Sequence, residues 1–88
     1  MIDAKIRIPQ SSLIYNYDKN HDILDVFIEK FCPVFSEEIY SGIYILYDRT
    51  TDFISGVTIM DYTKRDKCYI NNFLPFSIDF TEVDKNAR

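Results

Sequence analysis

The chain has 88 residues, of which 47% are hydrophobic and 16% aromatic, with only two glycines and three prolines. This length holds a single domain, and the apolar content excludes a disordered tail. The net charge of −4 excludes a surface built mainly to bind nucleic acid, which needs clustered lysine and arginine. A chain this short buries only about 60% of its unfolded surface, so we expect a protein partner, a second copy, or both to cover apolar surface.

The sequence favours a cytoplasmic protein with no membrane association. No apolar stretch reaches the roughly eighteen residues of a membrane helix, and the amino end, which begins Met1-Ile2-Asp3, has no signal-peptide pattern. Cys32 and Cys68 are too few for a disulfide framework. We expect both thiols to be reduced and to serve as small buried apolar groups.

Residues 5–8 alternate before Pro9, and the sequence leaves open whether they form a short edge strand or a flexible arm. The first clear strand is predicted over 12–17, which is rich in β-branched and aromatic residues. A polar turn over 18–22 follows, because aspartate and asparagine favour tight turns. The next strand covers 23–31 and ends before Pro33, since proline cannot donate a ladder hydrogen bond. Together these elements predict a β-hairpin.

A second hairpin follows with nearly the same pattern. Its strands are predicted over 39–47 and 53–60, and an aspartate-bounded turn over 48–52 joins them. Gly42 indicates a bulge or bend within the first of these strands. Because every connection is short, we expect the four strands to form an antiparallel meander in chain order.

Both faces of the strand over 39–47 carry large apolar side chains, so another segment must cover one of them. The carboxyl-terminal third is the candidate. A helix is predicted there that begins at Asp61 or Asp66 and ends before Pro75, followed by a short strand over 76–80. The apolar side of this helix would hold Tyr69, Ile70, Phe73 and Leu74.

The predicted fold class is therefore α+β and mainly β: a four-stranded antiparallel meander of two hairpins, a short carboxyl-terminal helix and an extra strand. The single domain spans 1–88, with the repeat over 12–65, a covering segment over 66–83 and a frayed tail over 84–88. The sequence leaves open whether the covering segment packs on its own sheet or on another copy.

Several groups of residues follow one another in a specific order and spacing. They are Tyr17-Asp18, Asp22, Leu24, Val26 and Ile28, then Gly42-Ile43-Tyr44-Ile45, Tyr47-Asp48 and the stretch from Gly56 to Arg65. In this order, Leu13 to Arg65 resembles a bacterial family named domain of unknown function 2283. The resemblance implies a small antiparallel β domain without an established enzymatic activity. Some members resemble partners of small toxin-like proteins, which implies an antitoxin-like role. The chain departs from the family pattern at Asp25, where an aromatic residue is common, and from Cys68 onward it matches nothing in the family.

Known chemical motifs do not fit this chain. Asp18, Asn20 and Asp22 have the spacing of a calcium loop, but Ile23 stands where that loop needs glycine. His21 has no second histidine to build a zinc site, so we expect a solvated turn residue. The sequence holds no phosphate loop, serine elbow or pair of catalytic acids. We therefore expect no enzymatic activity, no metal and no cofactor.

Two sets of residues are candidates for binding. If both turns point the same way, their carboxylates form an acidic rim suited to a basic partner; otherwise they are ordinary solvated turn residues. The rim residues are Asp18, Asp22, Asp48 and Asp52. Aromatic side chains suit protein interfaces, and the candidates are Tyr15, Phe31, Phe35 and Tyr44.

The favoured function is a small acidic protein-interaction module that binds a partner, forms a homodimer, or does both. The alternative is a small ligand-binding or enzymatic domain that uses the turn carboxylates at a cleft.

Overall fold

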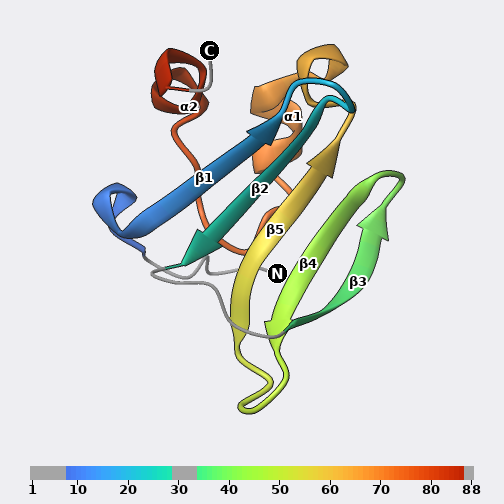
Figure 1. Cartoon of the computed structure of the whole chain (residues 1–88), viewed down its shortest axis with the longest axis vertical. Coiled ribbons are helices and arrows are strands. Elements are labelled where there is room, and N and C mark those ends of the chain that lie inside the picture. Colours follow the sequence, from blue (N-terminus) through green and yellow to red (C-terminus); the bar gives the residue numbers. More distant parts are fainter. Residues whose placement is uncertain (1–7, 29–33, 87–88) are drawn as a thin grey trace.

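The computed structural model describes residues 8–28 and 34–86 (Figure 1). One antiparallel sheet contains β1 (Leu13–Asp18), β2 (Ile23–Ile28), β3 (Val34–Tyr40), β4 (Ile43–Asp48) and β5 (Ile54–Met60). The helical elements are η1 (Gln10–Ser12), η2 (Tyr62–Lys64), α1 (Lys67–Asn71) and α2 (Phe80–Asn86). The prediction of a mainly β fold with antiparallel hairpins is confirmed. No helix among the described residues is long and apolar enough to cross a bilayer.

The order of strands in the sheet is β1-β2-β5-β4-β3, so the predicted four-stranded meander is wrong. The last strand, β5, lies inside the sheet, where Val57 faces Val26 of β2 on one side and Ile45 of β4 on the other. A fifth strand, β3, forms an edge of the sheet. It exists because Ser41 and Gly42 make a tight turn, in which Gly42 has a φ of 81°, instead of a bulge inside one long strand.

The two aspartate-bounded turns use the same local chemistry. The first aspartate of each turn accepts a hydrogen bond from the backbone N–H two residues later, from Asn20 to Asp18 over 3.0 Å and from Thr50 to Asp48 over 2.7 Å. The closing aspartate of each turn adopts the left-handed conformation, with φ values of 54° and 64°. The internal repeat of the sequence therefore encodes two equivalent turns.

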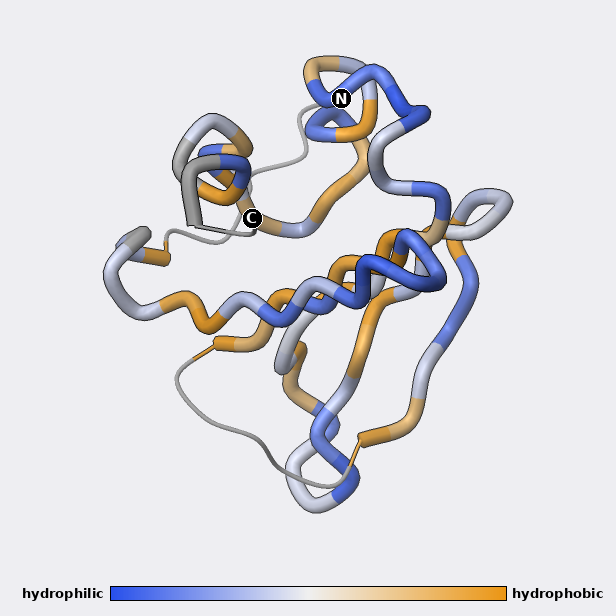
Figure 2. Tube along the Cα trace, turned by 45° about the horizontal axis from the view of Figure 1, so that its top comes forward, coloured by the Kyte–Doolittle hydropathy of each residue, from blue (hydrophilic) through white to orange (hydrophobic). Residues whose placement is uncertain are grey.

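The carboxyl-terminal third covers one side of the sheet, which we call the core face (Figure 2). The sheet contributes the buried side chains of Leu24, Val26, Ile43, Val57 and Ile59, and the segment after β5 contributes Ile70, Leu74, Phe76, Ile78, Phe80 and Val83. Burying a side chain of this size contributes about 1.5–3 kcal/mol. The covering segment thus packs on its own sheet.

The predicted strand over 76–80 is wrong, although the alternation that suggested it does place side chains in the core. Within that range only Phe76 forms a β-bridge, and Phe80 already begins α2. The amide of Asn71 takes the place of a neighbouring strand: its Nδ2 donates to the carbonyl of Ile78 over 3.0 Å, and its Oδ1 accepts from the Ile78 N–H over 3.2 Å. The backbone N–H and C=O groups of Ile78 are thereby hydrogen-bonded without a neighbouring strand.

The helices of this segment begin partly where the sequence indicates. Asp66 caps α1, since its Oδ1 accepts the backbone N–H of Tyr69 over 3.2 Å. The predicted frayed tail is wrong for residues 84–86, which lie in α2. The hydroxyl of the buried Tyr62 donates to Asp84 over 2.7 Å, and Val83 is fully buried. Both contacts hold α2 against the core.

The carboxylate of Asp22 ties the first hairpin to the segment that follows β5. Its Oδ1 accepts the Tyr17 hydroxyl over 2.7 Å, and its Oδ2 accepts the Thr63 hydroxyl over 2.8 Å. The backbone N–H of Thr63 donates to the same carboxylate over 3.1 Å, and the N–H of Tyr62 donates to the Asp22 carbonyl over 3.0 Å. This position fixes where the chain turns from the sheet onto the core face.

We expect Asp22→Asn to lower the free energy of unfolding by about 1–3 kcal/mol, because hydrogen bonds to a charged acceptor are lost. Asparagine keeps the tolerance for left-handed backbone, so backbone strain does not enter. The matched control is Asp52→Asn in the equivalent exposed position, which should change the value by less than about 0.5 kcal/mol. Urea denaturation measures both, and equal losses in the two variants would contradict the proposed tie.

The same carboxylate should make stability depend on pH. The hydrogen bond from Tyr17 is the main cause that holds the pKa of Asp22 below its usual value, and burial only partly offsets it. Such a carboxyl stabilises the fold above its unfolded pKa of about 4, and the contribution is lost as the pH falls through the lower folded value. The stability difference between wild type and D22N should therefore shrink as the pH falls from about 6 to about 2. A difference that stays constant would rule this out.

Arg65 links the turn between β3 and β4 to the end of β5. Its Nε donates to the Met60 carbonyl over 2.6 Å, and its Nη2 donates to the Ser41 carbonyl over 2.7 Å. The guanidinium passes directly over Gly42, where a Cβ atom would overlap Nη2. Glycine is thus required at this position both for its positive φ and for the passage of Arg65.

These two requirements can be separated by a double-mutant cycle. Gly42→Ala should lower the free energy of unfolding by about 2–4 kcal/mol, from left-handed strain together with lost Arg65 hydrogen bonds. In an Arg65→Ala background the same substitution should cost only the backbone part, about 1–2 kcal/mol. Urea denaturation of the four proteins gives the cycle, and full additivity would show that the guanidinium does not constrain Gly42.

Candidate functional site

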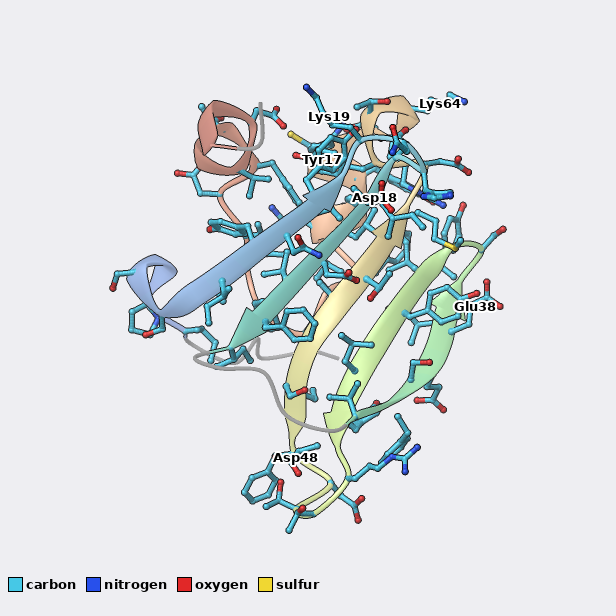
Figure 3. All side chains as sticks on the ribbon, in the orientation of Figure 1. Tyr17, Asp18, Lys19, Glu38, Asp48 and Lys64 are labelled. Carbon is cyan, nitrogen blue, oxygen red and sulfur yellow. The ribbon has the colours of Figure 1, made fainter. Side chains whose placement is uncertain are left out.

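The predicted acidic rim does not exist, because the two aspartate-bounded turns lie at opposite ends of the sheet. Ile23 pairs with Met60, so the first turn lies where β5 ends, whereas the second turn leads into the start of β5. Figure 3 shows Asp18 and Asp48 at the two ends. The physical reason is the extra strand β3, which reverses the chain once more before the second turn.

Asp18, Asp22 and Asp48 each have a hydrogen-bond partner for the side-chain carboxylate. Asp18 forms an exposed hydrogen bond with His21, whose Nδ1 lies 2.8 Å from the Asp18 Oδ2. This hydrogen bond is the main cause that lowers the pKa of Asp18. Asp22 ties two segments together, as described above. Among residues 8–28 and 34–86, no group of three or more histidine, cysteine, aspartate or glutamate side chains is placed to hold a metal ion.

The predicted interface residues do not gather on one surface. Tyr15 pairs with Val26 on the core face and packs against the core, so its prediction as a contact residue is wrong. Tyr44 lies half-buried on the other side of the sheet, and Phe35 is 43% exposed on β3. Phe31 lies outside the described residues.

The expectation of buried thiols is wrong for Cys68, which is exposed at the start of α1. Cys32 lies outside the described residues.

The side of the sheet opposite the core face, which we call the open face, has no described helix over it (Figure 1). It contains a shallow hollow of about 290 Å³ that is lined by Ile23, Ser36, Tyr44, Leu46, Thr58 and Met60. Next to this hollow, the Thr58 hydroxyl donates to Asp25 over 2.6 Å. The side chains of Thr58 and Asp25 on the open face are thus already paired with each other.

The most exposed strand is β3, and we call its residues 34–40 the β3 edge. Six of its seven residues are exposed. Among them are three large apolar side chains, Phe35 at 43%, Ile39 at 37% and Tyr40 at 43% exposure. The rings are held in place, since Phe35 stacks on Tyr47 with centroids 5.2 Å apart and Tyr40 stacks on Phe73 at 4.8 Å.

Two consecutive carboxylates interrupt these apolar residues. Glu37 and Glu38 are neighbours in a strand, so their side chains point to opposite faces of the sheet, and Figure 3 shows Glu38 at the rim. Glu37 Oε1 accepts the Tyr47 hydroxyl over 3.2 Å, and Glu38 Oε2 accepts the Gly42 N–H over 2.9 Å. Burial is the main cause that raises the pKa of Tyr47, and the hydrogen bond to Glu37 is the second. Neither glutamate forms an ion pair with any residue in the part of the chain that the structure describes.

Sequence reasoning missed most of this surface. Glu37 and Glu38 read as residues before a long strand that begins at Ile39, whereas all three belong to the separate strand β3. The signal that could have found them is the Ser41-Gly42 pair, because a Ser-Gly dipeptide between two apolar runs is typical of a turn.

No family model, curated protein or solved structure matches the chain. The resemblance of Leu13 to Arg65 to the family named domain of unknown function 2283 stays a prediction.

If the β3 edge is a contact surface and not part of the core, removing its side chains should barely affect folding. Ile39→Ala should lower the free energy of unfolding by about 1 kcal/mol or less. The matched control, Ile43→Ala, empties a fully buried position on the next strand and should cost about 2–5 kcal/mol. Chemical denaturation compares the two, and similar losses would place Ile39 in the core.

Proposed function

We propose that this chain is a small acidic protein-interaction module of the cytoplasm and that the β3 edge is its principal contact surface. The observation that carries the proposal is the exposure of Phe35, Ile39 and Tyr40 together on one edge strand. Exposed apolar side chains that cluster in this way are typical of surfaces that bind other proteins. Tyrosine and phenylalanine are also enriched in interfaces.

The rigidity of the surface supports the proposal. Phe35 and Tyr40 are each stacked on a ring of a neighbouring element, so little side-chain freedom is lost when a partner binds. Tyr69 extends the aromatic surface, since it lies edge-on to Tyr40 with centroids 6.3 Å apart and is 49% exposed. A hydrogen bond with Tyr40 is the main cause that raises the pKa of Tyr69.

A heterologous protein partner fits this surface better than a second copy does. Two copies of an acidic chain repel each other, and the β3 edge carries two of the negative charges. A homodimer, and an antitoxin-like role in which the partner is a small toxin, both stay predictions. The second of these rests on the family resemblance of Leu13 to Arg65 alone.

The alternative function, a ligand-binding or enzymatic domain built on the turn carboxylates, needs those groups at one cleft. Asp18 and Asp22 lie at one end of the sheet, and Asp48 and Asp52 at the other. That arrangement offers no shared cleft, so nothing in the geometry favours this alternative over protein binding.

Photo-crosslinking tests the proposal. A photoreactive phenylalanine analogue at Ile39, in cells that naturally carry the protein, should give one or a few discrete adducts. The control carries the same group at Asn20, which is exposed in the turn between β1 and β2, at the opposite edge of the sheet. The mass of the adduct separates a homodimer from a complex with another protein. No discrete adduct at Ile39, or the same adducts at both positions, would overturn the proposal.

A further inference from the structure

Among residues 8–28 and 34–86, the β3 edge is an open end of the sheet. Within these residues β3 pairs with β4 on one side only, and it is the last strand in the order β1-β2-β5-β4-β3. Alternate residues of an antiparallel edge strand turn their backbone N–H and C=O groups away from the sheet, toward solvent. The other edge, β1, is better covered, since only two of its six residues are exposed.

The β3 edge lacks most of the devices that block pairing with another strand. Proteins protect such edges with charged side chains, above all lysine, and with proline, short strands or bulges. Residues 34–40 contain neither proline nor lysine, and only the irregularity between Glu38 and Tyr40 interrupts the register. Before it, the five residues from Val34 to Glu38 run in regular register and present a template for one more strand.

The charges on this edge select its occupant. An incoming strand would place one side chain opposite Glu37 on one face and the next opposite Glu38 on the other face. In a symmetric antiparallel pair of two β3 strands, four carboxylates would share one ladder, and full overlap would set the two Glu37 side chains opposite each other. Like charges opposite one another destabilise a sheet, so a second copy fits poorly.

The remaining positions define the rest of the pattern. Phe35 lies on the same face as Glu37 and would meet an apolar or aromatic side chain two positions from the basic residue opposite Glu37. Val34 is half-buried and favours a further apolar neighbour. An antiparallel strand that suits the β3 edge therefore reads basic, basic, any residue, apolar, apolar from its amino end.

We propose that the β3 edge binds an extended basic and apolar peptide segment of a partner protein by strand addition, as a sixth strand of the sheet. This inference rests on the proposed function and specifies its mode. Backbone hydrogen bonds supply the general affinity, and Glu37 and Glu38 supply the preference for lysine or arginine.

A synthetic peptide tests the mode directly. The probe is a blocked, fluorescent peptide reading Thr-Lys-Lys-Thr-Phe-Val-Thr, and its anisotropy is followed on titration with the wild-type chain. We expect saturable binding that weakens with added salt. A peptide with glutamate in place of both lysines should bind at least about tenfold more weakly. Equal binding of the two peptides would overturn the charge preference.

N-methylation separates strand addition from simple apolar or ionic attachment. One version of the peptide is methylated on its odd-numbered backbone nitrogens and another on its even-numbered ones. Because alternate amides of an added strand face the sheet, one version should lose binding and the other should keep it. If both versions bind like the parent peptide, or if the parent peptide does not bind at all, strand addition at the β3 edge is wrong.

A charge-matched pair of variants assigns the preference to this edge. Glu37→Gln with Glu38→Gln removes two negative charges from β3, and the control, Asp52→Asn with Asp61→Asn, removes two from exposed positions elsewhere. The first variant should weaken binding of the lysine peptide about tenfold, and the control should change it less than about twofold. Equal losses would assign the effect to net charge. If the peptides do not bind while a photoreactive group at Ile39 still gives a discrete crosslink, the proposal of protein binding is retained and only strand addition is rejected.

Discussion

The pairing of β2 with β5 holds the molecule together, because it joins two units that are otherwise local in the chain. β1 and β2 form one hairpin, and β3, β4 and β5 form a run of two more. Between these units, Leu24 faces Ile59 and Val26 faces Val57, and all four side chains are fully buried. Without this contact neither unit would offer a face wide enough for the carboxyl-terminal layer to cover.

The same pairing decides which surfaces stay exposed. With β5 inside the sheet, the segment that follows Met60 leaves from an inner strand, and Asp22 anchors it through Thr63 at that end of the sheet. The covering layer therefore reaches β1 and the central strands, and it meets β3 where Tyr40 contacts Tyr69 and Phe73. The exposed apolar side chains of the β3 edge follow from where the chain leaves the sheet.

Local features could be predicted from the sequence, and long-range choices could not. Both turns, the cap at Asp66 and the covering role of the last third follow from residue chemistry within a few positions. The pairing of β5 with β2 does not follow from the local sequence, because Val57 could face any apolar strand. The hairpin pattern alone favours pairing between strands that are consecutive in the chain. The candidate site could be predicted only in part: Phe35 is exposed as expected, but Tyr15 packs against the core. The number of strands decides at which end of the sheet a turn lies, and the strand register decides which face a side chain occupies.

The glutamates of β3 have a second consequence, for the behaviour of the protein in concentrated solution. An apolar edge strand without proline or lysine is the type of segment from which cross-β assemblies grow, and flanking charges act as gatekeepers against it. In β3 the charged residues that oppose such assembly are Glu37 and Glu38. The net charge of the whole chain is zero near its isoelectric point of about 4.7. Mildly acidic buffers should therefore favour fibrous aggregation, whereas neutral or alkaline buffers should keep the protein dispersed.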